Sequence, residues 1–210
     1  ADFVSGHLTL SQKTGAKIIY GPTAQPAFEA HIATDGEIFK VGKLTLIALH
    51  TPGHTMESTT YLLRDENGKD HAIFSGDTLF LGDVGRPDLA QKAADMTQEQ
   101  LAATLYTSLR TKIMPLADEV IVYPAHGAGS ACGKNLSKET VGTLGEQKRT
   151  NYALRADMTV EEFVKEVTDG LLPPPVYFPE NVNKNKNGYE AIDVIIEKNR
   201  AFTPVEFKQA

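Results

Sequence analysis

Short apolar runs that end in glycine-containing loops recur along the chain, and three of these loops contain a residue able to bind a metal. The apolar runs cover residues 44–49, 71–74 and 119–123. Each has the length and composition of a buried strand. The loops that follow contain His54, Asp77 and His126. Because enzymes built on packed sheets carry functional residues in the loops at strand ends, we expect these side chains to converge.

The spacing of apolar and polar residues predicts further elements around these strands. Hairpins are predicted over 36–49, with a turn at Gly42-Lys43, and over 61–74, with a turn at 65–68. Helices are predicted over 5–15, from Thr97 to just before Pro115, from Ser137 to Asn151 and from Thr159 to Thr168. We expect residues 171–179 to be extended, 181–188 to be turn-like, and 189–210 to form a short helix and then a linker without helix around Pro204.

Composition and charge exclude several classes of protein. The 210 residues, 41% of them hydrophobic, can bury the core of an ordinary domain. The net charge is −6 with scattered lysine and arginine, so nucleic acid is not an expected partner. No run approaches the roughly 20 apolar residues of a membrane span, and residues 1–7 have neither the basic start nor the apolar stretch expected of a signal peptide. The single cysteine, Cys132, excludes an internal disulfide and suits a reducing compartment, so we expect a cytoplasmic protein.

Two imidazoles and one carboxylate form a donor set typical of transition-metal sites. Imidazole binds metals such as zinc and iron, and a carboxylate adds negative charge and can bridge two ions. A histidine in a loop also fits a surface or hydrogen-bonded role, so the metal interpretation depends on the three residues meeting. The remaining histidines are expected to have such ordinary roles; they are His7, His31, His50 and His71.

The three loops also carry a family resemblance. They read Thr51-Pro52-Gly53-His54-Thr55, Ser75-Gly76-Asp77-Thr78 and Tyr123-Pro124-Ala125-His126. In order and spacing they resemble the metal motifs of the metallo-β-lactamase superfamily, in its glyoxalase II-like branch. The similarity covers residues 1–188, taken as one domain, and implies an α/β fold, the four-layer αββα sandwich, without its first strands. Exposed sheet edges and apolar surface would follow, so we expect pairing with another chain, as a homo-oligomer or with a separate N-terminal piece.

Two further segments resemble the persulfide dioxygenases within that branch, including bacterial forms fused to rhodanese domains. They are the Gly-Arg-Pro-Asp sequence at 85–88, and residues 158–163 together with 171–175. Residues 189–210 resemble a helix and linker that lead into a rhodanese domain, which we expect as a partner in cis or in trans. The chain starts without a methionine, and we expect it to be a piece of a longer polypeptide.

The resemblance implies one Fe(II) per chain, held by two histidines and one aspartate, which leaves positions for O₂ and substrate. His54 and Asp77 match the second histidine and the aspartate. The first histidine belongs to a His-x-His-x-Asp motif, of which only the aspartate, Asp2, is present. Zinc hydrolases of the branch have a histidine directly after that aspartate, where this chain has Phe3. Asp2 and His126 therefore keep part of a second metal site, and Phe3 favours one iron over two zinc ions.

The implied activity is the oxidation of a low-molecular-weight persulfide by O₂ to sulfite and a thiol. One alternative is a binuclear zinc thioester hydrolase of the glyoxalase II type, against which Phe3 argues. Another is a non-catalytic domain of a multidomain sulfurtransferase, favoured by the missing histidine. Polar residues retained at three strand ends argue against that second alternative.

Three residues are catalytic candidates besides the metal ligands of the first site. Arg86 is expected to meet an anionic substrate, or alternatively to form a structural pair with Asp88. His126 is a candidate hydrogen-bond donor beside the metal. Cys132 follows it by six residues and is a candidate persulfide carrier, with its pKa lowered by Lys134, or alternatively a buried thiol without a chemical role.

Overall fold

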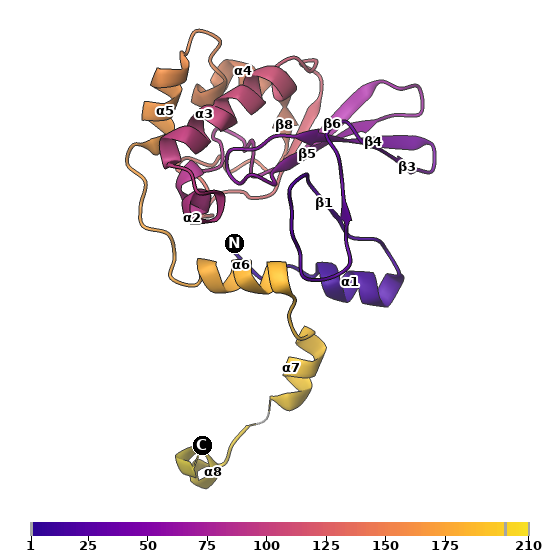
Figure 1. Cartoon of the computed structure of the whole chain (residues 1–210), viewed down its shortest axis with the longest axis vertical. Helices are drawn as coiled ribbons and strands as arrows, with labels where there is room; N and C mark the ends of the chain where they lie inside the picture. Colours follow the sequence, from indigo (N-terminus) through magenta and orange to yellow (C-terminus); the bar gives the residue numbers. More distant parts are fainter. Residues whose placement is uncertain (1, 200, 210) are drawn as a thin grey trace.

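The computed structural model describes residues 2–199 and 201–209, and its main element is a six-stranded mixed sheet (Figure 1). Its strands, in spatial order, are β3 Ile38–Val41, β4 Leu44–His50, β5 Thr59–Arg64, β6 Asp70–Gly76, β7 Ile121–Pro124 and β8 Gly142–Thr143. Neighbouring strands are antiparallel except β6 and β7, which are parallel. Strands β4, β6 and β7 therefore run in the same direction and end at the same edge of the sheet.

Helices and a small second sheet complete the described structure. The helices are α1 His7–Thr14, α2 Gln91–Ala94, α3 Gln98–Ser108, α4 Leu144–Thr150, α5 Val160–Thr168, α6 Phe178–Asn187, α7 Ile192–Lys198 and α8 Pro204–Gln209. Shorter turns are η1 Pro87–Ala90, η2 Leu109–Ile113, which continues α3 with π-helical bonds, and η3 Tyr152–Leu154. Strands β1 Ile19–Tyr20 and β2 His31–Ile32 pair in parallel. No helix of the described residues is long and apolar enough to cross a membrane.

The hydrophobic core lies between one face of the large sheet and helices α3, α4 and α5. Ile73 and Val122 of the sheet are fully buried there, as are Leu105 of α3 and Phe163 of α5. The opposite face of the sheet is more open, and Phe74 stacks on Tyr123 there with both side chains about two-fifths exposed. The sheet and its helices make two of the four layers that the resemblance implies, within the part of the chain that the structure describes.

Several predicted elements are confirmed. Both hairpins form with the expected turns. Helix α3 begins after Thr97, whose hydroxyl accepts the backbone N–H of Gln100 in a capping box. Helix α5 begins after Thr159, with Glu162 in the same capping role. These boundaries are set by local side-chain contacts, which is why the sequence predicts them well.

Several predictions at the carboxyl side are wrong. The helix predicted from Ser137 begins only at Leu144, because Gly142–Thr143 pairs with β7 and the Thr143 hydroxyl caps the helix instead. Residues 181–187 of the segment predicted to be turn-like belong to α6, and Gly188 follows that helix as its C-cap. Helix α6 also includes residues 178–179, which were predicted to be extended, because Phe178 is buried and a proline is accepted in the first turn. The segment around Pro204, predicted to lack helix, forms α8 with that proline at its first position.

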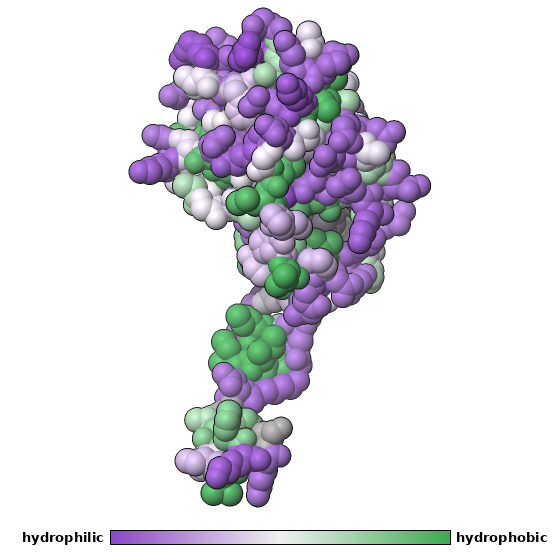
Figure 2. Space-filling view, turned by 90° about the vertical axis from the view of Figure 1, so that its left-hand side faces the viewer, coloured by the Kyte–Doolittle hydropathy of each residue, from purple (hydrophilic) through white to green (hydrophobic). Residues whose placement is uncertain are grey.

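Helices α7 and α8 extend away from the sheet (Figure 1), and Figure 2 shows apolar side chains gathered on this extension. Its exposed apolar residues include Ile192, Ile196 and Phe207. An ion pair of 2.6 Å between Lys13 and Asp193 links the extension to α1. The prediction that residues 189–210 lead into a rhodanese domain stays a prediction.

Candidate metal centre

The predicted metal residues meet at the edge where β4, β6 and β7 end. His54 Nε2 lies 3.1 Å from one carboxylate oxygen of Asp77, and His126 Nε2 lies 3.4 Å from the other. On its far side His126 Nδ1 lies 3.5 Å from the carboxylate of Asp2. The structure thus brings all four predicted metal residues together in one continuous chain of contacts.

The His54 ring is oriented by contacts at both of its nitrogens. Its Nδ1 lies 2.8 Å from the backbone carbonyl oxygen of Arg86, which can only accept a hydrogen bond. Nδ1 therefore carries the proton, and in the neutral ring Nε2 presents its lone pair toward Asp77. Gly85 makes this approach possible, because a Cβ there would lie 2.0 Å from the Asp77 carbonyl oxygen and 3.0 Å from the His54 ring. A carbonyl that holds the non-ligating nitrogen is typical of histidines in metal sites.

Charge at the centre is balanced by protons when no cation is bound. Burial opposes ionisation of Asp77, but His54 and His126 hold the pKa of its carboxyl well below the usual range. Burial also lowers the pKa of His54, yet the Asp77 carboxylate overcomes this and raises it. The hydrogen bond to Asp77 raises the pKa of His126 against the effect of burial. Two imidazoles and two carboxylates that face one another are a donor set that fits a transition-metal ion.

Comparisons with known proteins agree with this geometry. No protein-family model matches the chain. Human mitochondrial persulfide dioxygenase ETHE1 is 30% identical over 176 residues, which are 83% of this chain and 60% of that protein. A probable hydroxyacylglutathione hydrolase of Schizosaccharomyces pombe is 32% identical over 126 residues, 60% of this chain and 44% of that protein.

Solved structures give the same result. A metallo-β-lactamase from Staphylococcus aureus matches with a TM-score of 0.77 at 30% identity, and the match covers 96% of this chain and 58% of that protein's chain. ETHE1 from Myxococcus xanthus has a TM-score of 0.71 at 29% identity, over 89% of this chain and 72% of its own. This chain belongs to the metallo-β-lactamase superfamily. The predicted family and fold class are confirmed.

The relatives support the superfamily but include proteins of more than one activity. Metallo-β-lactamase superfamily proteins bind metal ions, as the donor set of this chain indicates. A persulfide dioxygenase and a hydroxyacylglutathione hydrolase are similar to the chain to nearly the same degree, so identity alone does not choose between the two activities. The chain spans about 60% of the length of the human relative.

The metal-free protein is expected to become less stable as the pH rises above neutral. The pKa values of His54 and His126 are raised from 6.5 in the folded state, so the stability that their protonated forms contribute is complete below pH 6.5. It is lost as the pH rises through the folded values. The lowered pKa of Asp77 acts oppositely: its contribution is present above 3.8 and is lost as the pH falls below that value.

Thermal unfolding in chelator, at pH values on either side of 6.5, measures this effect. Added zinc should raise Tm more on the alkaline side, because metal ions compete with protons for the imidazoles. A metal-free Tm that rises steadily through that range would contradict the assignment.

The surroundings of Cys132 differ from the prediction. The Nζ of Lys134 donates to the backbone carbonyls of Glu166 and Asp169, away from the thiol. Burial and the nearby carboxylates raise the pKa of Cys132 to about 12. The prediction that Lys134 lowers this pKa is wrong, because the loop turns the lysine toward the end of α5.

Arg86 forms the structural pair that was one of its two predicted roles. Its guanidinium donates two hydrogen bonds of 2.7 Å to the carboxylate of Asp88, and others to the carbonyls of Ala131 and Leu172. The side chain is 5% exposed. Arg86 therefore fastens the segment before α6 and the loop that contains Cys132 to the loop after Asp77.

Two supporting residues were missed by sequence reasoning. The buried Asp83 accepts hydrogen bonds from the backbone N–H groups of Lys134 and Asn135, and so shapes the loop after Cys132. Asn185 of α6 bonds the backbone of Phe3 and Ser5 at 2.9 Å, and so holds the segment that carries Asp2. The position of Asp83 in a glycine-rich loop could have indicated its role. Nothing in the sequence indicates the contact of Asn185 with Ser5, which lies 180 residues away.

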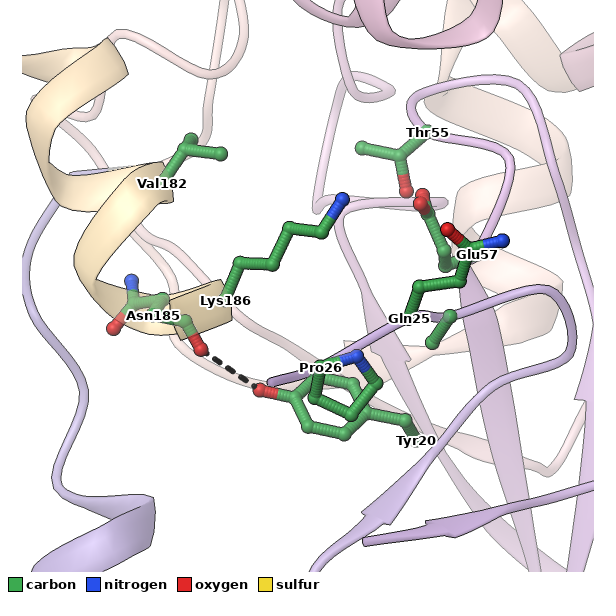
Figure 3. A pocket seen from close by; sticks show the side chains of 9 residues that line it. Tyr20, Gln25, Pro26, Thr55, Glu57, Val182, Asn185 and Lys186 are labelled. Carbon is green, nitrogen blue, oxygen red and sulfur yellow. Dashed lines mark hydrogen bonds between the residues drawn. The ribbon is translucent and has the colours of Figure 1, made fainter. Parts of the chain in front are cut away.

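A cavity of about 320 Å³ opens beside the His54 loop (Figure 3). It lies between α6, the segment after β1 and the loop at Thr55 and Glu57. The ammonium of Lys186 points from α6 across the cavity toward these two residues (Figure 3). The floor is formed by Tyr20, whose hydroxyl donates to the Asn185 carbonyl at 3.3 Å. The cavity thus offers one cation and one anion to a small ligand.

Proposed function

We propose that this chain is part of an iron-dependent persulfide dioxygenase, which oxidises a low-molecular-weight persulfide with O₂ to sulfite and a thiol. The observation that supports this best is the His54–Asp77 pair, an imidazole nitrogen and a carboxylate oxygen 3.1 Å apart at one sheet edge. One imidazole and one carboxylate with a further histidine make the facial set that binds non-haem Fe(II). The human persulfide dioxygenase among the relatives is a second support.

His54 and Asp77 would hold the iron, and other residues position them. Bound there, Fe(II) would supply the redox chemistry by which both atoms of O₂ add to the outer sulfur of the persulfide. Overall, RSSH, O₂ and water give RSH, sulfite and two protons. The Arg86 carbonyl fixes the His54 ring, and His126 donates through Nε2 to Asp77. The ring of Phe3 lies 6.3 Å from that of His126 and adds no donor for a second metal.

The assay for this function measures sulfite and oxygen together. Glutathione persulfide is supplied to the protein loaded anaerobically with Fe(II), and one sulfite should form for each O₂ consumed. His54→Gln should abolish both, whereas His71→Gln is the matched control, because that histidine lies exposed in β6 away from the centre. Sulfite formation that persists in His54→Gln, or that needs no oxygen, would overturn the proposal.

A zinc thioester hydrolase is the second candidate, and one observation favours it. Asp2 and His126 keep two donors of a second metal position 3.5 Å apart. A hydrolase would cleave S-lactoylglutathione without oxygen when loaded with zinc. Such cleavage, with no oxygen-dependent sulfite, would assign the chain to that activity instead.

We further propose that the cavity beside His54 binds the thiol carrier of the persulfide. Lys186 would meet a carboxylate and Glu57 an ammonium, the two charges at the glutamyl end of glutathione. Lys186→Gln should raise KM for glutathione persulfide about threefold to tenfold with kcat nearly unchanged, as expected when a partly exposed charged contact of roughly 1 kcal/mol is lost.

Lys184→Gln is the matched control for this prediction. Lys184 lies on the same helix but pairs with Glu180 at 3.1 Å and does not line the cavity. Equal KM values for the two variants and the unmodified protein would place the carrier elsewhere.

A further inference from the structure

An apolar groove of about 620 Å³ lies between α6 and the segment that forms η1 and α2. Apolar side chains line it from both sides: Leu89 and Ala93 on one, and Pro174, Phe178 and Val182 on the other. Val182 is 50% exposed and Ala93 is also exposed, so the groove is open to solvent. It has the dimensions of a binding site and lies apart from the metal centre.

The charged groups along this groove are positive on balance. Two lysines line it, Lys92 and Lys186, and neither forms an ion pair within the part of the chain that the structure describes. The carboxylate that lines it, Asp88, is held by Arg86 at 2.7 Å. The groove therefore fits an apolar segment that also carries negative charge.

Helix α7 of the same chain is a segment of that kind. Ile192, Ile195 and Ile196 lie at positions i, i+3 and i+4, so they share one face of the helix, and each is 51–63% exposed. Asp193 and Glu197 lie beside this face, one turn apart. Apolar residues at this spacing are the anchors by which an amphipathic helix binds in a groove.

The contacts of the chain hold α7 away from its own groove. The connection from α6 to α7 contains Tyr189, whose hydroxyl accepts the backbone N–H of Leu8 at 3.3 Å. Lys13 of α1 pairs with Asp193 of α7 at 2.6 Å. These contacts tie α7 to α1, and Figure 1 shows α7 continuing from α6 on the side opposite to α2. No residue of α7 lines the groove of its own chain.

We propose that α7 of one chain docks in the groove between α2 and α6 of a second copy, and that the second copy returns the contact. The isoleucine face of α7 would cover the apolar walls of the groove, and Glu197 would face Lys92 at its rim. An exchange of the same helix in both directions closes a twofold dimer, in which each copy gives and receives one α7. This dimer does not depend on which reaction the metal centre supports.

Sedimentation equilibrium of the whole chain tests the proposal, and we expect twice the mass of one chain. Ile195→Glu places a carboxylate on the docking face of α7, and Ala93→Glu places one on the wall of the groove. Both positions are exposed, so both variants should fold. Each should raise the Kd of the dimer by about 100-fold or more, because a charge would enter apolar surroundings at both of the equivalent contacts.

Val41→Glu is the matched control. It makes the same kind of change at a residue of β3 that is 56% exposed and lies outside both the groove and α7. Its Kd should equal that of the unmodified chain. Circular dichroism establishes that each variant is folded.

A mixture of the two variants distinguishes this docking from other ways of pairing. Ile195→Glu keeps an intact groove, and Ala93→Glu keeps an intact α7. An equimolar mixture should therefore form a heterodimer through one contact, at concentrations where each variant alone is a monomer. A monomeric unmodified chain would overturn the proposal, and would be the result if α7 docked in its own groove. A dimer that survives Ala93→Glu, or a mixture that stays monomeric, would overturn it as well, because the copies would then pair through another surface.

Discussion

Asp77→Asn is expected to weaken metal binding by about 100-fold or more. The Asp77 carboxylate faces both imidazoles, at 3.1 Å from His54 Nε2 and 3.4 Å from His126 Nε2. An amide of the same shape keeps the packing but removes the negative charge and replaces one oxygen by an NH₂ group, which cannot bind a metal ion. Zinc titration against a competing chelator measures the loss.

Asp70→Asn is the matched control for that substitution. Asp70 begins the same strand, β6, and bonds Arg64 at 2.6 Å far from the site. Its substitution should leave zinc affinity unchanged. If Asp77→Asn binds zinc as tightly as the unmodified chain, Asp77 does not hold the metal, and the proposed centre is wrong.

Arg86→Ala should lower the free energy of unfolding by about 3–5 kcal/mol. The substitution leaves the Asp88 carboxylate, 15% exposed, without its partner and the carbonyls of Ala131 and Leu172 without their donor. Removal of one member of a buried ion pair is far more costly than the pair is stabilising, because the remaining charge stays away from water. Denaturant unfolding of the metal-free protein measures the effect apart from metal binding.

The chain contains a matched control for this prediction. Arg155 also pairs with an aspartate two residues later, Asp157, through a bidentate contact. These two side chains, however, are 56% and 72% exposed. Arg155→Ala should therefore leave the free energy of unfolding nearly unchanged, because solvent screens an exposed ion pair. Comparable losses for the two substitutions would show that Arg86 does not fasten the three segments as its contacts indicate.

The strand ends that carry His54, Asp77 and His126 could be predicted because their signal is local. An apolar run sets each strand, and the loop after it sets the place of the functional residue. Pairing in the sheet then brings the three together, since β4, β6 and β7 share one direction. The same kind of local signal placed the capping boxes that begin α3 and α5.

Contacts across long sequence distances could not be predicted in this way. The start of α4 depends on pairing between β8 and β7, and α6 forms in a polar segment that local pattern assigns to a turn. Asn185 holds the segment that carries Asp2 from 180 residues away. The environment of Cys132 likewise depends on where Lys134 and Asp2 lie, so its pKa was predicted in the wrong direction.

Metal content tests the central claim most directly. The chain is prepared anaerobically and its iron and zinc are measured, alongside the same chain extended upstream through a His-x-His motif and the Asp77→Asn variant of each. We expect about one iron per extended chain at the first position, lost in the Asp77→Asn variant, with oxygen-dependent sulfite from a persulfide. If neither iron nor zinc were found in the given chain or in the extended chain, the account would be contradicted. A non-catalytic domain of a larger protein would then be the better description.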